Sequence, residues 1–256
     1  MALWRWLLVG LCVVSLALAS PLRAETADAR AELDEAAWAF ALWAGAVGDA
    51  AALFEISGPE VKTIWEHDPS LPDAARNLFG TAEPGGVTLQ LSGRGWRMRS
   101  GGAERLLTRN AAHEVAHVWQ YSLGDADRAP RWLHEGFADA LAREALGAEG
   151  APAAPAARCR DVLRKRPVSL AQRAGDENAI YDCGSVIVSA VAAARGESVR
   201  DLYRAFAANG FSRAGLLTLA DEASPKYGRS VTAFLRTDYS MADPAWVIEQ
   251  LRAGRL

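Results

Sequence analysis

The segment HEVAH places two histidines, His113 and His117, four residues apart, with Glu114 directly after the first. On an α-helix, residues four apart differ by about 40° in direction and about 6 Å along the axis, so both imidazoles face one point. Imidazoles are common zinc ligands, and Glu114 on the flank of that face can accept a proton from water without binding the metal. The spacing predicts a metal site with an adjacent general base. The alternative is an ordinary helix that carries two structural histidines.

A third ligand is available in the segment PRWLHEGFADALARE, where Glu135 follows His117 by eighteen positions. Two adjacent antiparallel helices would bring Glu135 close to both histidines. Catalytic zinc sites use three protein ligands and keep a fourth position for water. We therefore expect one zinc ion per chain, held by His113, His117 and Glu135. Asp139, one turn after Glu135 on the same face, is expected to accept the outer N–H of a ligand histidine.

HEVAH and WLHEGFAD together resemble the HExxH…E pattern of the gluzincin metallopeptidases, in the peptidase MA-like and M1-aminopeptidase-like group. The segment YDCGSVIVSAVAAARGESVRDLYRAF is similar to the next helices of that group, and the resemblance covers about residues 104–208. It implies a zincin-like fold, peptide-bond hydrolysis and an oxyanion-stabilising role for Tyr181. A core position at the start of a helix is the alternative for Tyr181. The Gly-Ala-Met-Glu-Asn motif of M1 aminopeptidases is absent, so aminopeptidase specificity is not implied.

The expected reaction is zinc-dependent hydrolysis of a peptide or protein substrate, with Glu114 as the general base. In related enzymes an edge strand pairs with the substrate backbone, and residues 87–91 are predicted to fill that role. Two other classes stay open. An exported zinc amidase that acts on a non-protein amide would use the same residues. A non-catalytic zincin-fold binding protein would have no need for Glu114 and Asp139.

The elements that position these residues follow from hydrophobic spacing and from Gly and Pro. One or two helices are predicted up to about Ile56, followed by an irregular segment over 57–85. Alternating Val87, Leu89 and Leu91 predict a strand, with a hairpin through residues 92–95. Helices are predicted over 103–122 and 130–146, with a flexible Ala/Pro/Gly connector after them. More helices are predicted at about 178–195, 198–208, 213–222, 229–236 and 243–252.

These elements predict an α+β fold that is predominantly helical, zincin-like, with a small β-sheet before the HExxH helix. Residues 1–24 are expected to be a signal peptide, 25–100 an N-terminal region of helices and sheet, and 101–256 the helical metallopeptidase region. Residues 25–256 are expected to form one compact unit.

Composition narrows the partners and the compartment. The net charge of −3 and the scattered Lys and Arg residues exclude a nucleic-acid binder. Arg5, an apolar run over 6–19 and small residues up to Ala24 are typical of a secretory signal peptide. We therefore expect an exported protein, periplasmic or extracellular, that is not stably inserted in a membrane after the signal peptide is cleaved. An uncleaved anchor and a lipoprotein acylated at Cys12 are the alternatives.

Export leaves two cysteines, Cys159 and Cys183, and an oxidising compartment favours a disulfide between them over two buried thiols. The remaining histidines are not expected to bind metal: His67 lies in a Pro-rich loop, and His134 points about 100° away from Glu135 on the helix. Three aromatic residues that flank the motifs are predicted to pack in the core: Trp119, Trp132 and Phe137.

Overall fold

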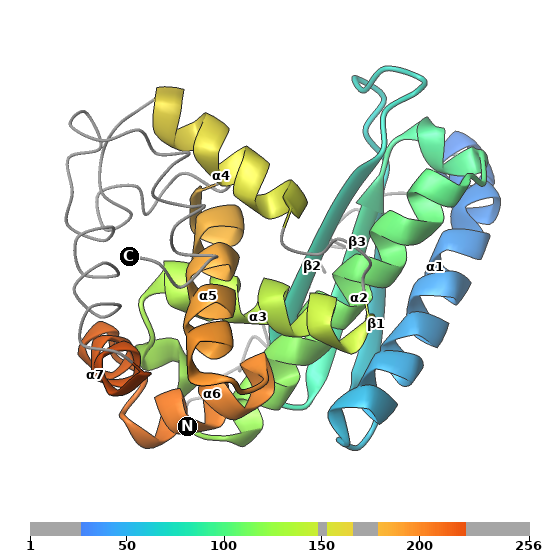
Figure 1. Ribbon diagram of the computed structural model, residues 1–256. Coiled ribbons are helices and arrows are strands. Elements are labelled where there is room, and N and C mark those ends of the chain that lie inside the picture. The colour runs from blue at the N-terminus through green and yellow to red at the C-terminus, as the bar shows by residue number, and fades with distance from the viewer. Residues whose placement is uncertain (1–26, 148–152, 166–178, 224–256) are drawn as a thin grey trace, which may run out of the picture.

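The computed structural model describes residues 27–147, 153–165 and 179–223, which form helices around one small sheet (Figure 1). The helices are α1 (Ala27–Phe54), α2 (Gly101–Ser122), α3 (Arg131–Ala145), α4 (Ala153–Lys165), α5 (Gly184–Arg195), α6 (Val199–Ala208) and α7 (Arg213–Ala223). The strands are β1 (Glu60–Glu66), β2 (Asn77–Glu83) and β3 (Gly86–Ser92). The predicted α+β class, mostly helical with a small sheet before the HExxH helix, is confirmed. The predicted signal peptide and the predicted helices at 229–236 and 243–252 lie outside the described residues.

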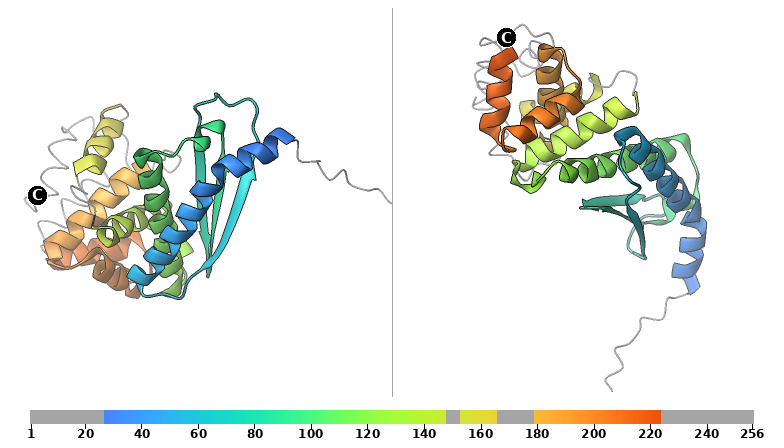
Figure 2. Two further views of the ribbon diagram at one scale, coloured as in Figure 1. Left: turned by 90° about the vertical axis from the view of Figure 1, so that its right-hand side faces the viewer. Right: turned by 90° about the horizontal axis from the view of Figure 1, so that it is seen from below.

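Helix α2 lies between the sheet and α1 on one side and the C-terminal helices on the other (Figures 1 and 2). Its N-terminus is capped by Ser100, whose Oγ accepts the backbone N–H of Ala103. All ten residues from 111 to 120 are buried, so this half of the helix is covered on every side. A helix covered in this way normally carries apolar residues all round. The polar residues inside this stretch therefore require partners within the fold.

Helix α1 packs along α2 through a stripe of small and aromatic residues at helical spacing. The buried members are Ala36, Ala39, Trp43, Val47, Ala50 and Phe54. Among the described residues, Asp28–Phe54 is the one helix that is long and apolar enough to cross a membrane by length and composition. The buried stripe assigns it instead to the packed fold. His67 hydrogen-bonds to Glu32 of this helix, with 2.7 Å between Nδ1 and Oε2, which is the structural role expected of that histidine.

The sheet has the order β1-β3-β2, with β1 parallel and β2 antiparallel to β3. Three sequence predictions are wrong here. Residues 57–85 are not irregular, because they contain β1 and β2. Strand β3, which contains Val87–Leu91, is the central strand, so its backbone is paired on both sides and has no free edge for a substrate. Residues 92–95 form no hairpin, because β3 runs into a 3-10 helix at Arg94–Arg97 and pairs instead with β2 through a turn at Pro84-Gly85.

Helices α3 and α5 cross in close contact at two glycines. A Cβ atom added at Gly136 would lie 2.5 Å from the backbone carbon of Gly184, and one added at Gly184 would lie 2.3 Å from the carbonyl oxygen of Trp132. Helix α5 follows a π-helical turn, Ala179–Cys183, which this crossing holds against α3. The two glycines therefore set how closely the Tyr181 turn approaches the metal-site helices.

Helix α4 begins inside the segment predicted to be a flexible connector, so that prediction is wrong from residue 153 onward. Pro155 does not prevent this, because it stands in the first turn of the helix, where a backbone N–H has no intrahelical acceptor. Cys159 of α4 and Cys183 of the π-helical turn form a disulfide, with 4.9 Å between their Cα atoms. The three aromatic residues expected in the core, Trp119, Trp132 and Phe137, are buried.

The glycine crossing predicts that Gly136→Ala lowers the free energy of unfolding by about 1–3 kcal/mol, because the added methyl group forces α3 and α5 apart. The matched control is Gly48→Ala on α1, where an added Cβ meets no atom within 4 Å. That change should leave the protein as stable or stabilise it by up to about 1 kcal/mol. Urea unfolding of both variants measures the difference. Equal free energies of unfolding for the two variants would contradict the close contact of α3 and α5 at Gly136.

Candidate metal centre

Three side chains from α2 and α3 converge on one point. The Nε2 atoms of His113 and His117 lie 3.1 Å apart, and each lies 3.2 Å from Oε2 of Glu135. Ligand atoms about 2.0–2.2 Å from a tetrahedral ion lie roughly 3.3–3.6 Å from one another. The triangle is close to that size, and these three residues form a group that can hold a metal ion. The structure therefore brings together all three residues predicted as ligands.

Gln120 sets the orientation and tautomer of the His117 ring. Its amide group donates to the carbonyl oxygen of His134 at 3.2 Å, which leaves Oε1 to face Nδ1 of His117 at 2.8 Å. An amide oxygen only accepts, so Nδ1 must carry the proton. The lone pair of neutral His117 then lies on Nε2, which points at the shared site. Gln120 is completely buried, and it fulfils the function that the sequence analysis expected from Asp139.

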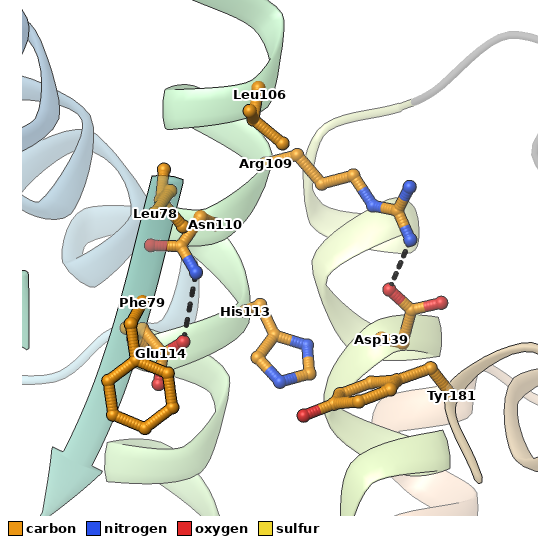
Figure 3. Close-up of a pocket in the computed structure, with 10 residues that line it drawn as sticks. Leu78, Phe79, Leu106, Arg109, Asn110, His113, Glu114, Asp139 and Tyr181 are labelled. Carbon is orange, nitrogen blue, oxygen red and sulfur yellow. Dashed lines mark hydrogen bonds and ion pairs between the residues drawn. The ribbon is translucent and has the colours of Figure 1, made fainter. Parts of the chain in front are cut away.

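Glu114 is held beside the triangle by a chain of hydrogen bonds from α1. The indole N–H of Trp43 donates to Asn110 Oδ1 at 2.9 Å. The Asn110 amide in turn donates to Glu114 Oε1 at 3.0 Å (Figure 3). Gly80 of β2 closes this pocket from the other side. A Cβ atom added at Gly80 would lie 2.3 Å from Glu114 Oε1, so only glycine allows the strand this close.

Burial controls the ionisation of both carboxylates. Burial raises the pKa of the Glu114 carboxyl to about 7, and the negative charge of Glu135 acts in the same direction. Burial also disfavours ionised Glu135, but hydrogen bonds with His113 and His117 outweigh it and hold its pKa far below the usual value. The two acids therefore differ in character. Glu135 is the permanently charged member, and Glu114 is the carboxyl that can exchange a proton near neutral pH.

Asp139 has different partners from those expected. Its Oδ1 atom accepts from Arg109 at 2.6 Å, and its Oδ2 atom accepts from Arg143 at 2.6 Å. Both guanidinium groups hold the pKa of the buried carboxyl below its usual value, against the effect of burial. Asp139 thus links α2 to α3 beside the site. Its carboxylate also neutralises part of the positive charge of Arg109 and Arg143. No hydrogen bond between Asp139 and a ligand histidine occurs among the described contacts.

Tyr181 and His134 lie on different sides of the ligand histidines. The Tyr181 ring centre is 5.5 Å from that of His113, and its hydroxyl points toward His113 and Glu114 (Figure 3). His134 stacks on His117, with 4.3 Å between the ring centres, and burial lowers its pKa to about 4. His134 lies outside the ligand triangle. Of the two, Tyr181 lines the cavity beside the triangle.

The Tyr181 turn is fixed from behind by α4. Arg158 donates to both carboxylate oxygens of Asp182, at distances of 2.7–3.0 Å. The disulfide between Cys159 and Cys183 lies next to this ion pair. The two residues that follow Tyr181 are therefore anchored, Asp182 by a bidentate ion pair and Cys183 by a covalent bond. This anchoring limits how far the phenol can move from the metal-site helices.

A cavity of about 250 Å³ opens beside the triangle. It is smaller than the roughly 300–1,000 Å³ of typical pockets for drug-sized ligands, so it suits an amino-acid side chain better than an organic cofactor. Three apolar side chains, three charged ones, and the polar groups already described line it: Leu78, Phe79, Gly80, Leu106, Arg109, Asn110, His113, Glu114, Asp139 and Tyr181.

Sequence reasoning missed four residues of this centre. Asn110 and Gln120 stand four residues before Glu114 and three after His117, so helical spacing alone places them beside these residues. That signal was available. Trp43 and Gly80 come from α1 and β2, and their contacts with α2 depend on tertiary packing that no local pattern reports. No known protein family, curated protein or solved structure matches this chain.

The hydrogen bond from His117 to Gln120 predicts that Gln120→Met weakens zinc binding about 10- to 100-fold, because the outer N–H of a ligand histidine loses its acceptor. Methionine fills the same volume, so the fold should remain. The matched control is Gln90→Met on β3, whose amide binds Glu66 and not a ligand histidine. This variant should bind zinc as the unchanged protein does. Competition with a chromophoric chelator measures both affinities, and equal values would refute the role of Gln120.

Proposed function

We propose that this chain is a zinc-dependent peptidase of the gluzincin type, with His113, His117 and Glu135 as the zinc ligands. The observation that carries the proposal is the triangle of 3.1–3.2 Å formed by these three side chains, with the Glu114 carboxyl fixed next to it. Two imidazoles and one carboxylate are the donor set of catalytic zinc sites. A purely structural site is normally closed by four protein ligands, and here the described residues supply three.

Zinc in this site would lower the pKa of a water molecule toward neutrality and polarise the carbonyl group of the substrate. Glu114 then accepts a proton from the water and passes it to the leaving amine. A carboxyl with a raised pKa suits both steps, because it exchanges protons near neutral pH. The Tyr181 hydroxyl donates a hydrogen bond to the carbonyl oxygen as that oxygen gains negative charge.

Strand β2 replaces β3 as the proposed binding edge for the substrate backbone. It pairs with β3 on one side, and no described strand pairs with its other edge. Leu78, Phe79 and Gly80 of this strand line the cavity beside Glu114. An extended peptide can form main-chain hydrogen bonds with such an edge, which would align a peptide bond with the metal centre. A peptide or protein is therefore the proposed substrate.

Export of this peptidase is part of the proposal. The apolar N-terminal segment is compatible with a signal sequence. A disulfide between Cys159 and Cys183 fits an oxidising compartment, either the periplasm or the extracellular space.

The assignment of Glu114 as base and not ligand predicts that Glu114→Gln keeps about one zinc per chain and the same fold. Peptidase activity should fall by several orders of magnitude, because the proton acceptor is lost. His117→Ala should lose the zinc itself, whereas His67→Ala, a histidine change outside the site, should keep both zinc and activity. Metal analysis and cleavage of a mixed-peptide library measure these results.

Two outcomes would contradict the proposal. Unchanged protein purified without chelator and containing no zinc would refute the metal site. Zinc-loaded protein that cleaves no peptide, or a fully active Glu114→Gln variant, would refute the peptidase reaction. Hydrolysis of a non-protein amide by the same protein would identify an amidase instead.

The orientation of Tyr181 predicts that Tyr181→Phe lowers kcat and kcat/KM together by about 10- to 1000-fold, while KM and zinc content stay nearly constant. A phenol that contributes only to packing would behave differently. Its loss would lower the melting temperature and leave the turnover of folded protein intact. Steady-state kinetics and thermal unfolding of the same preparation separate the two roles. An unchanged kcat would transfer the oxyanion role to another donor, with His134 tested next.

A further inference from the structure

The cavity beside the metal centre has chemically different ends. Arg109 and Leu106 lie at one end, and Glu114 and Phe79 lie at the other (Figure 3). His113 and Tyr181 lie nearer the Glu114 end. The metal chemistry and the base occupy only part of this space. The Arg109 end has no function in the proposed reaction, although it lines the same cavity.

Arg109 can bind a second anion in addition to Asp139. Its Nη2 atom donates to Asp139 Oδ1 at 2.6 Å, and this is the one hydrogen bond from its guanidinium group to the described residues. A guanidinium group carries five N–H donors in a planar fork. The Arg109 side chain is 43% exposed and lines the cavity, so it is open to solvent on one side.

The charge of Asp139 does not fully cancel that of Arg109. Asp139 is 3% exposed and is shared with Arg143, whose Nη2 atom lies 2.6 Å from Oδ2. One carboxylate thus faces two guanidinium groups. The other acid that lines the cavity, Glu114, lies at the opposite end, where Asn110 binds its Oε1 atom. An anion at the Arg109 end would therefore lie beside a guanidinium group and away from the Glu114 carboxylate.

Apolar side chains lie at both ends of the cavity. Leu78, Leu106 and Phe79 line it, and Leu106 and Phe79 are 46% and 62% exposed. These surfaces gain from contact with apolar groups of a ligand, because such contact removes them from water. The expected ligand consequently combines an apolar part with a negative charge.

We propose that the Arg109 end of the cavity is a subsite for a substrate carboxylate, and that Leu106 beside it and Leu78 and Phe79 farther along the cavity make apolar contacts with the same substrate. This inference rests on the proposed peptidase function and names its substrate class: peptides with a carboxylate within one or two residues of the scissile bond. The carboxylate is either the C-terminus of the peptide or the side chain of Asp or Glu. Arg109 binds both by the same pair of charge-assisted hydrogen bonds.

The test measures binding without hydrolysis, in zinc-loaded protein that carries Glu114→Gln. Three fluorescent, N-blocked peptides of one apolar sequence differ only in charge: a free C-terminal carboxylate, a C-terminal amide, and an amide with one internal Glu. At least one carboxylate peptide should bind about 10- to 100-fold more tightly than the uncharged amide, the range of a hydrogen bond between charged groups. The tighter of the two identifies the source of the carboxylate.

Variants at Arg109 assign this preference to the guanidinium group. In the same background, Arg109→Gln should bind all three peptides with nearly equal affinity, and Arg109→Lys should keep part of the preference. Arg105→Gln is the matched control, because Arg105 lies one turn earlier on α2 and does not line the cavity. It removes the same charge and should keep the full preference. The salt dependence of the preference in protein with Arg109 intact gives a second reading, since added salt should weaken it.

Equal binding of charged and uncharged peptides when Arg109 is present would overturn the proposal. A preference that survives Arg109→Gln, or binding of none of the three peptides, would do the same. These outcomes are distinct from failure of the proposed function, which is absence of zinc or of hydrolysis in the unchanged protein. The same assay on metal-free protein separates the two, because Arg109 is not one of the three proposed metal ligands.

Discussion

The contact between α2 and α3 is the constraint on which the rest of this structure depends. It brings Oε2 of Glu135 to 3.2 Å from the Nε2 atoms of both His113 and His117. Polar groups buried in this way destabilise a fold unless each has a partner. A bound cation would satisfy all three atoms at once, so the fold and the proposed chemistry impose the same requirement on this contact.

The surrounding elements supply the partners that the remaining polar groups need. Helix α1 provides Trp43 for the chain to Asn110 and Glu114, and the end of α2 provides Gln120 for His117. Strand β2 approaches Glu114 closely because Gly80 has no side chain. Each of these contacts fixes a rotamer or a tautomer that the proposed reaction requires. The elements that form the apolar core therefore position Glu114 and His117 through a few hydrogen bonds at the edge of the core.

Most of the ligand set was predictable because its spacing is local. His113, Glu114 and His117 share one helix, so helical geometry alone brings these three side chains within reach of one another. Glu135 follows on the next helix, and its approach depends on the packing of α3 against α2. Strands β1 and β2 were missed because their residues are largely exposed and lack a continuous alternation of apolar residues. Their strand identity comes from pairing with β3, which is a non-local interaction. Without them, β3 looked like an edge strand when it is the central one.

The predictions for Asp139 and for the flexible connector were wrong for a similar reason. The sequence placed Asp139 correctly on α3, next to the site. Its hydrogen-bond partners are Arg109 of α2 and Arg143 one turn away, and they occupy the oxygens that a histidine N–H would need. Helix α4 begins in an Ala- and Pro-containing segment whose composition is typical of a linker. There the disulfide from Cys159 and the ion pair from Arg158 to Asp182 bind the helix to the Tyr181 turn.

The most direct test of this account is zinc K-edge X-ray absorption of the protein loaded with one equivalent of zinc. We expect a four-coordinate ion with nitrogen and oxygen ligands at about 2.0–2.2 Å and a clear imidazole signature from two histidines. Glu135→Gln should change that spectrum, while Glu114→Gln should leave it unaltered. A six-coordinate, fully hydrated ion, a sulfur ligand, or a spectrum that depends on Glu114 and not on Glu135 would contradict the proposed ligand set.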